Sequence, residues 1–206
     1  MWKSFFGKKP SDEKIDRLVE QKNSREYKVY PVLKNGAWPG LQAGALRQVL
    51  VGSEEDPQVV IGFGYDTPEN VLFLTQLDLK DLDPNQILVD AYKNLGEYET
   101  SFEYASRFDK KLLVSSGMEF SSERILVKEH MMKAHEMLDA EEILVTIPRR
   151  RCMLVMDRQA EPELINAFVA MHRNAWQDDS YGNAPIANML FVLKAGQMIG
   201  TIPMED

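Results

Sequence analysis

The sequence predicts an α+β protein with a largely antiparallel or mixed sheet built from hairpins, and with three to four helices packed mainly on one face of that sheet. Short runs rich in apolar, β-branched and aromatic residues occur in pairs separated by turn sequences, a pattern typical of β-hairpins. Single segments whose apolar residues recur at helical spacing lie between these pairs. Hairpins that alternate with single helices favour an antiparallel sheet covered by helices.

The chain divides into an N-terminal helical arm, predicted over residues 1–25, and a single α+β domain, predicted over residues 26–206. In the arm, Ser11 can cap a short helix whose apolar residues recur at i, i+3 and i+4 from Ile15. We find no internal repeat, and no linker after residue 26. A domain of this length can bury a hydrophobic core without disulfide bonds.

The first half of the domain contains three predicted strands. Residues 27–33 alternate between apolar and polar side chains, which indicates a strand. Residues 41–51 fit a helix or a strand equally well. Residues 59–65 and 71–77 are apolar runs separated by the turn sequence 66–70, and they predict a β-hairpin with a five-residue loop.

The helix that follows has signals at both ends. Asp83 is suited to the N-cap position and Pro84 to the first helical position. Gln86 completes a capping box, and Gly96 can end the helix in a left-handed conformation. The sequence therefore predicts a helix over about residues 84–95.

The second half repeats the pattern of hairpins and single helices. The predicted elements are strands at 98–104 and 112–115, a helix from Ser121 or Ser122, a hairpin of 143–147 with 152–156, a helix from Pro162, and a hairpin of 188–193 with 197–202. Residues 152–156 are apolar at every position, which is typical of a strand buried on both sides.

The charge of the chain is negative and unevenly distributed. The sequence has 24 Lys and Arg against 32 Asp and Glu, a net charge of −8. This balance disfavours general nucleic-acid binding, which requires clustered basic residues. Residues 51–100 hold 2 basic and 11 acidic residues, so their net charge is −9. This segment predicts either a basic protein partner or a solvated acidic surface.

Several classes of protein are excluded by missing patterns. No run approaches the roughly 18 apolar residues of a membrane-spanning helix, and the first residues lack a signal-peptide pattern, so we expect a cytoplasmic protein. Cys152 is the only cysteine, which rules out an internal disulfide. The stretch Gly62-Phe63-Gly64 lacks the third glycine of a dinucleotide-binding turn, and no phosphate-binding loop is present, so no cofactor is predicted.

Three stretches follow one another along the chain: residues 71–75 with the helix after them, residues 117–126 (GMEFSSERIL), and residues 145–150 (VTIPRR) paired with 184–186 (API). In this order they resemble the YtpQ-like proteins, a bacterial family of unknown function. The resemblance covers about residues 60–200 in motif order and hydrophobic pattern. It implies a cytoplasmic bacterial α+β protein, and it carries no catalytic residue because none is assigned in the family.

The arginine triplet Arg149, Arg150 and Arg151 is the strongest candidate for a binding site. It lies on the short connection of a predicted hairpin, where three planar guanidinium groups could bind a phosphate or a carboxylate. Arg150 matches an arginine of the YtpQ-like proteins, whereas Arg149 and Arg151 differ from the usual neighbours of that arginine. The alternative is a solvated turn in which an arginine pairs with the protein's own acidic surface.

The histidines and the cysteine have the patterns of structural residues. His130 and His135 are five residues apart on one predicted helix, about 140° around its axis, whereas zinc-binding pairs on a helix are four residues apart. We therefore predict no metal site. His172 borders an apolar helix face, and Cys152 begins a strand buried on both sides, so we expect a core thiol rather than a nucleophile.

Two classes of function remain after these exclusions. A non-enzymatic binding or accessory protein is the first, because no nucleophile, base and oxyanion-binding pattern is found together. The alternative is an enzyme or sensor that binds an anionic small molecule near Arg150. The sequence does not define the oligomeric state.

Overall fold

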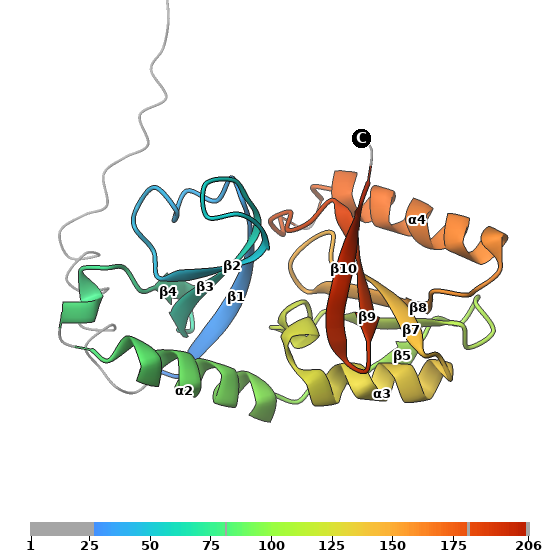
Figure 1. The fold of residues 1–206 in the computed structure, drawn as a ribbon, viewed down its shortest axis with the longest axis horizontal. Coiled ribbons are helices and arrows are strands. Elements are labelled where there is room, and N and C mark those ends of the chain that lie inside the picture. The colour runs from blue at the N-terminus through green and yellow to red at the C-terminus, as the bar shows by residue number, and fades with distance from the viewer. Residues whose placement is uncertain (1–26, 81, 181, 205–206) are drawn as a thin grey trace, which may run out of the picture.

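The computed structural model describes residues 27–80, 82–180 and 182–204, and over these residues it is an α+β fold with two mostly antiparallel sheets of hairpins and three α-helices. The predicted fold class is confirmed. Figure 1 shows the two sheets side by side, each with its own helices. The helical arm predicted over residues 1–25 lies outside the described residues. That residues 26–206 form one domain stays a prediction.

The first lobe is the four-stranded sheet with one helix, α2 (Pro84–Glu97). Its strands are β1 (Val29–Asn35), β2 (Arg47–Gly52), β3 (Pro57–Asp66) and β4 (Val71–Phe73). The long strand β3 pairs antiparallel with all three others. The predicted hairpin is thus confirmed as β3 and β4, and the ambiguous segment 41–51 contains the start of strand β2 rather than a helix.

Helix α2 begins as the sequence predicts and ends differently. Asp83 is the N-cap, and its side chain accepts a hydrogen bond of 2.9 Å from the Asn85 N–H. Gly96 remains inside the helix, which ends at Glu97, and Tyr98 caps it with extended backbone. The expectation that Gly96 ends the helix in a left-handed conformation is therefore wrong. Tyr98 packs against aromatic rings of the core, which draws the chain away from a glycine turn.

The second lobe is a six-stranded antiparallel sheet in the order β10-β9-β7-β8-β6-β5. The strands are β5 (Glu103–Tyr104), β6 (Leu112–Ser116), β7 (Glu142–Thr146), β8 (Cys152–Asp157), β9 (Met189–Lys194) and β10 (Gln197–Pro203). The hairpins of β7 with β8 and of β9 with β10 confirm the predicted pairs. The strand predicted over 98–104 is reduced to the two residues of β5.

The helices of the second lobe, α3 (Lys128–Leu138) and α4 (Pro162–Gln177), lie on opposite faces of the six-stranded sheet (Figure 1). Met131 of α3 belongs to the same buried cluster as Val145 of β7. Phe168 of α4 belongs to a second cluster with Leu144, the residue just before Val145 in β7. Neighbouring strand residues point to opposite faces, so both faces of β7 are apolar and both need a cover. The expectation of helices mainly on one face is corrected accordingly. No helix within the described ranges is long and apolar enough to cross a membrane.

A short and mostly buried segment, residues 119–124, joins the two lobes; we call it, with its contacts in the first lobe, the junction. Phe120 stacks on Tyr30 of β1 with ring centroids 4.3 Å apart. Glu123 is fully buried, and its Oε1 accepts a hydrogen bond of 3.1 Å from the Leu33 N–H of β1. The Ser122 hydroxyl donates to Glu123 Oε2 at 2.8 Å. The junction therefore fastens an edge strand of the first sheet to the second lobe.

These junction contacts explain why the second predicted helix starts late. The sequence places its start at Ser121 or Ser122, but residues 123–126 form a 3₁₀ turn, η2 (Glu123–Leu126), and α3 begins only at Lys128. The Ser122 side chain makes no helix cap, because its hydroxyl is hydrogen-bonded to Glu123 and accepts from the Arg151 N–H. The predicted start is wrong for this reason.

Glu123 makes the stability of the protein depend on pH. Burial raises the pKa of its carboxyl group, and the hydrogen bonds from Ser122 and Leu33 oppose this rise only in part. A carboxyl whose pKa is higher in the folded state favours folding when protonated, so its contribution is lost as the pH rises through that pKa. Glu123→Gln keeps an acceptor for the Leu33 N–H and carries no charge. We expect it to be more stable than the wild type at neutral pH and equally stable near pH 4, in urea unfolding.

Glu123→Ala is the matched comparison. It leaves the Leu33 N–H without its acceptor and creates a cavity, so we expect a loss of about 2 to 4 kcal/mol in the free energy of unfolding. A Glu123→Gln variant with the same dependence of stability on pH as the wild type would show that Glu123 does not titrate as described.

Candidate functional site

The arginine triplet lies on the connection between β7 and β8, where it lines a cavity of about 490 Å³. The connection is held by residues that are distant in the sequence: Arg149 forms an isolated β-bridge with Pro185, and the Arg150 N–H donates to Ala184 O at 3.1 Å. Arg151 has φ of +64°, in the left-handed region, which turns the chain back into β8. The remaining residues that line the cavity are Ser116, Gly117, Cys152, Ala175, Asp178 and Asn183.

Arg149 has a structural role. Its side chain is only 11% exposed, and its Nη2 pairs with Asp179 Oδ1 at 2.6 Å. Its guanidinium group donates to Ala175 O at 2.8 Å, to Trp176 O at 2.6 Å and to Asn183 O at 2.8 Å. The first two carbonyls belong to the last turn of α4, where the helix itself supplies no N–H donors for them. Arg149 therefore caps α4 and is not free to bind a ligand.

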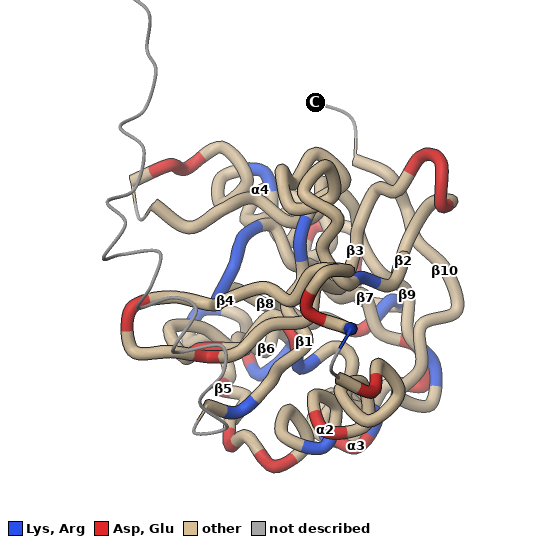
Figure 2. Tube along the Cα trace, turned by 90° about the vertical axis from the view of Figure 1, so that its left-hand side faces the viewer, with Lys and Arg blue, Asp and Glu red and all other residues tan. Residues whose placement is uncertain are grey.

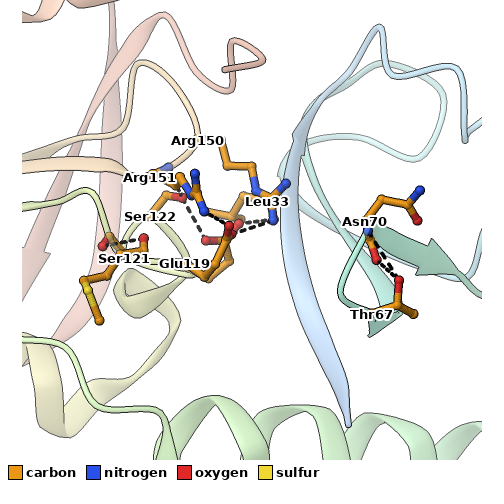
Figure 3. A network of polar contacts seen from close by, with 10 residues as sticks. Leu33, Thr67, Asn70, Glu119, Ser121, Ser122, Arg150 and Arg151 are labelled. Carbon is orange, nitrogen blue, oxygen red and sulfur yellow. Dashed lines mark hydrogen bonds and ion pairs between the residues drawn. The ribbon is translucent and has the colours of Figure 1, made fainter. Parts of the chain in front are cut away.

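Arg150 and Arg151 converge on one carboxylate, that of Glu119 (Figure 3). Arg150 Nη2 lies 2.9 Å from Glu119 Oε2, and Arg151 Nη2 pairs with Oε1 of the same group. Two positive charges thus meet a single negative charge. The Nε atoms of both arginines are buried and have no hydrogen-bond partner among the described residues. The pair keeps unused donors and a surplus positive charge.

Further charged groups surround Arg150 from the first lobe. Burial lowers the pKa of Lys34, and the charge of Arg150 lowers it further. Burial raises the pKa of Asp66, and Arg150 opposes that rise. Lys34 Nζ also lies over the ring of Phe73, 5.1 Å from its centre. Arg150 therefore faces both a cation and an anion of the first lobe, and these two opposite charges add no net charge to the site.

The acidic segment 51–100 does not form one continuous surface. Three of its exposed acidic residues, 54–56, lie in the turn between β2 and β3, and Glu54 pairs with Arg47 at 2.8 Å. Others lie along α2 and just after it, including Glu97 and Glu99. In Figure 2, acidic positions are spread over separate places on the molecule rather than gathered in one.

Cys152 and the two histidines of α3 are placed as structural residues. Cys152 is half-buried at the wall of the cavity rather than in the core, and burial raises the pKa of its thiol, which disfavours the reactive thiolate. His130 is buried against the Phe102 ring, with centroids 4.4 Å apart, and burial lowers its pKa to about 3. The Nδ1 of His135 lies 2.8 Å from Ala140 O. In the described part of the chain, no three His, Cys, Asp or Glu side chains gather in a way that could hold a metal ion.

His172 lies in a polar network that sequence reasoning did not find. Its Nδ1 is hydrogen-bonded to Thr146 Oγ1 of β7, and its Nε2 lies 3.0 Å from Asn188 Oδ1. His172 and Thr146 are fully buried, and burial lowers the pKa of the histidine. The network ties α4 to the sheet. Neither this network nor the role of Glu119 could be predicted from local spacing. The contacts of Glu119 are with residues about 30 positions away in the sequence.

Arg149→Ala tests the structural role of the first arginine. The variant leaves carbonyl groups at the end of α4 without their charged donor, so we expect a loss of about 2 kcal/mol in the free energy of unfolding. Arg158→Ala is the control, since it removes the same charge from an exposed pair with Glu142, and we expect a loss below about 1 kcal/mol. Equal losses in urea unfolding would contradict the capping role.

No protein-family model matches this chain, and neither a curated protein nor a solved structure matches it significantly. The resemblance to the YtpQ-like proteins stays a prediction. Its third motif pair does come together in the fold: residues 148–150 and 184–186 are joined by hydrogen bonds beside the arginine cavity.

Proposed function

We propose that this protein is a binding protein that accepts an anionic group, a phosphate or a carboxylate, at the cavity lined by Arg150 and Arg151. The observation that carries the proposal is the convergence of two guanidinium groups on one carboxylate, with a buried Nε in each that has no partner in the described part of the chain. Buried donors without acceptors are uncommon in folded proteins, and they call for an explanation such as a ligand.

The position of Glu119 indicates the chemistry of the ligand. Guanidinium groups bind planar carboxylates and phosphates through paired donors, and Glu119 is such a partner supplied by the protein itself. Arg150, Arg151 and Glu119 are all partly exposed, so their ion pairs are weak enough to be exchanged. A ligand with one negative charge would neutralise the surplus that Glu119 leaves, and a ligand with two would match both arginines if it displaced Glu119.

Binding is supported over catalysis by the groups that line the cavity. The lining includes no histidine among the described residues, and the one thiol, Cys152, has a raised pKa. Neither a base with a pKa near neutrality nor an activated nucleophile faces the proposed anion. A binding or sensing role requires neither.

Inorganic phosphate is the simplest probe. A ligand at 100 times its Kd stabilises a protein by about 2.7 kcal/mol, which for a chain of this size raises Tm by about 5 to 10 °C. We expect phosphate to raise Tm relative to chloride at the same ionic strength, and Arg150→Ala to abolish the rise. Arg158→Ala should keep it, because Arg158 pairs with Glu142 away from the cavity. A rise that persists in Arg150→Ala would remove the proposal.

Glu119→Gln refines the same test. If Glu119 competes with the ligand for the two arginines, its neutral isostere should bind phosphate about tenfold more tightly, a difference of about 1.4 kcal/mol. Isothermal titration calorimetry measures this change directly. Weaker binding would instead mean that Glu119 holds the arginines in position for the ligand.

A second candidate function is that of an accessory protein with a basic partner. It is supported by the exposed acidic residues along and after α2, Glu97 and Glu99 among them. We expect affinity purification from native cells to recover a basic protein with the wild type, and to lose it with the Glu97→Gln, Glu99→Gln double variant. Recovery of the same proteins with both baits would contradict this candidate.

A further inference from the structure

A second cleft, of about 760 Å³, is lined in part by Ser116 and Met118 and adjoins the arginine cavity at Ser116. Its walls come from the end of α2 and the residues after it, from β5 and β6, and from α3. The two hollows share only Ser116 among their lining residues. The volume is within the range of clefts that take small organic ligands.

Two residues that line this cleft, Arg124 and Thr100, each have a buried polar atom without a partner among the described residues. Arg124, on η2, is 6% exposed and donates from Nη1 to Leu95 O at the end of α2, but its Nε has no hydrogen-bond partner among the described residues. The Thr100 Oγ1 on the same cleft is likewise buried without a partner. A buried guanidinium N–H with no acceptor loses the free energy of its hydration, so an anionic acceptor from a ligand would restore it.

The charges around the cleft have opposite signs at different depths. Arg124 is buried, whereas three lining carboxylates, Glu97, Glu99 and Glu103, are exposed. Lys133 is a further lining residue and is exposed. A simple anion would be repelled by the three carboxylates, and a simple cation by the buried arginine. A ligand that carries both charges, with the negative one inside, satisfies both groups.

We infer that this cleft binds a small zwitterion, with a carboxylate on Arg124 and Thr100 and a cationic group facing Glu97 and Glu99. Two sources share this chemistry: a free basic amino acid, and the C-terminus of a peptide that ends in basic residues. The inference does not depend on the proposed anion site, because none of the residues that carry it belongs to the arginine triplet.

The ligands that test this inference are L-lysine, the tripeptide Ala-Lys-Lys and the C-terminal amide of that tripeptide. We expect calorimetric titration of the full chain to show binding of L-lysine or of Ala-Lys-Lys, and the one that binds identifies the source. The amide should bind at least about tenfold more weakly than the free tripeptide, because it lacks the carboxylate. Absence of binding by both L-lysine and Ala-Lys-Lys, or equal binding of tripeptide and amide, would overturn the inference.

Variants separate the two halves of the site. The double variant Glu97→Gln, Glu99→Gln should weaken binding about tenfold. Thr100→Val should also weaken binding, because it removes the hydroxyl group that contacts the carboxylate of the ligand. Both changes lie outside the core, so folding is retained. Glu163→Gln, on α4 at the opposite face of the sheet, is the matched control and should have no effect. Unchanged binding in the double variant would also overturn the inference.

Arg150→Ala distinguishes the two sites. It should abolish the effect of phosphate and leave the binding of L-lysine or Ala-Lys-Lys unchanged. Loss of the zwitterion in this variant would show that the cleft is not a separate site.

Discussion

The hydrogen bond from the Leu33 N–H to the buried Glu123 carboxylate is the interaction on which the arrangement of the two lobes depends. Strand β1 is at the edge of the first sheet, so its outward N–H groups need acceptors from elsewhere. Glu123 provides one, and the Ser122 hydroxyl satisfies the other carboxylate oxygen. Because the segment that carries these residues also carries Glu119 and Arg124, one buried stretch fixes the lobes and forms part of both candidate sites.

The class of fold could be predicted because it rests on local signals. Asp83 and Pro84 mark the start of α2, and the paired apolar runs mark the hairpins, since turn and cap chemistry act over a few residues. Helices on both faces of the second sheet could have been predicted from residues 152–156, because a strand that is apolar at every position needs cover on both faces. The two separate sheets were not, since nothing local distinguishes strands that pair with one sheet from strands of another.

The candidate site could be predicted only in part for a similar reason. The triplet was identified as a cluster of like residues, but Arg149 and its two neighbours have different roles that depend on distant groups. Arg149 binds the end of α4, whereas Arg150 and Arg151 bind Glu119, and these contacts join residues about 26 to 34 positions apart. Arg124 gave no signal at all, since its burial against α2 depends on how the lobes meet.

The junction also has a consequence for the order of events in folding. Its contact between Leu33 and Glu123 spans 90 residues, whereas the strand pairs of either sheet span at most 52, between Glu142 and Lys194. Contacts between distant residues form at a greater cost in chain entropy, so we expect each sheet to form before the lobes dock. Interactions that form after the transition state govern mainly the rate of unfolding. The lifetime of the assembled molecule should therefore be set at the junction rather than in either sheet.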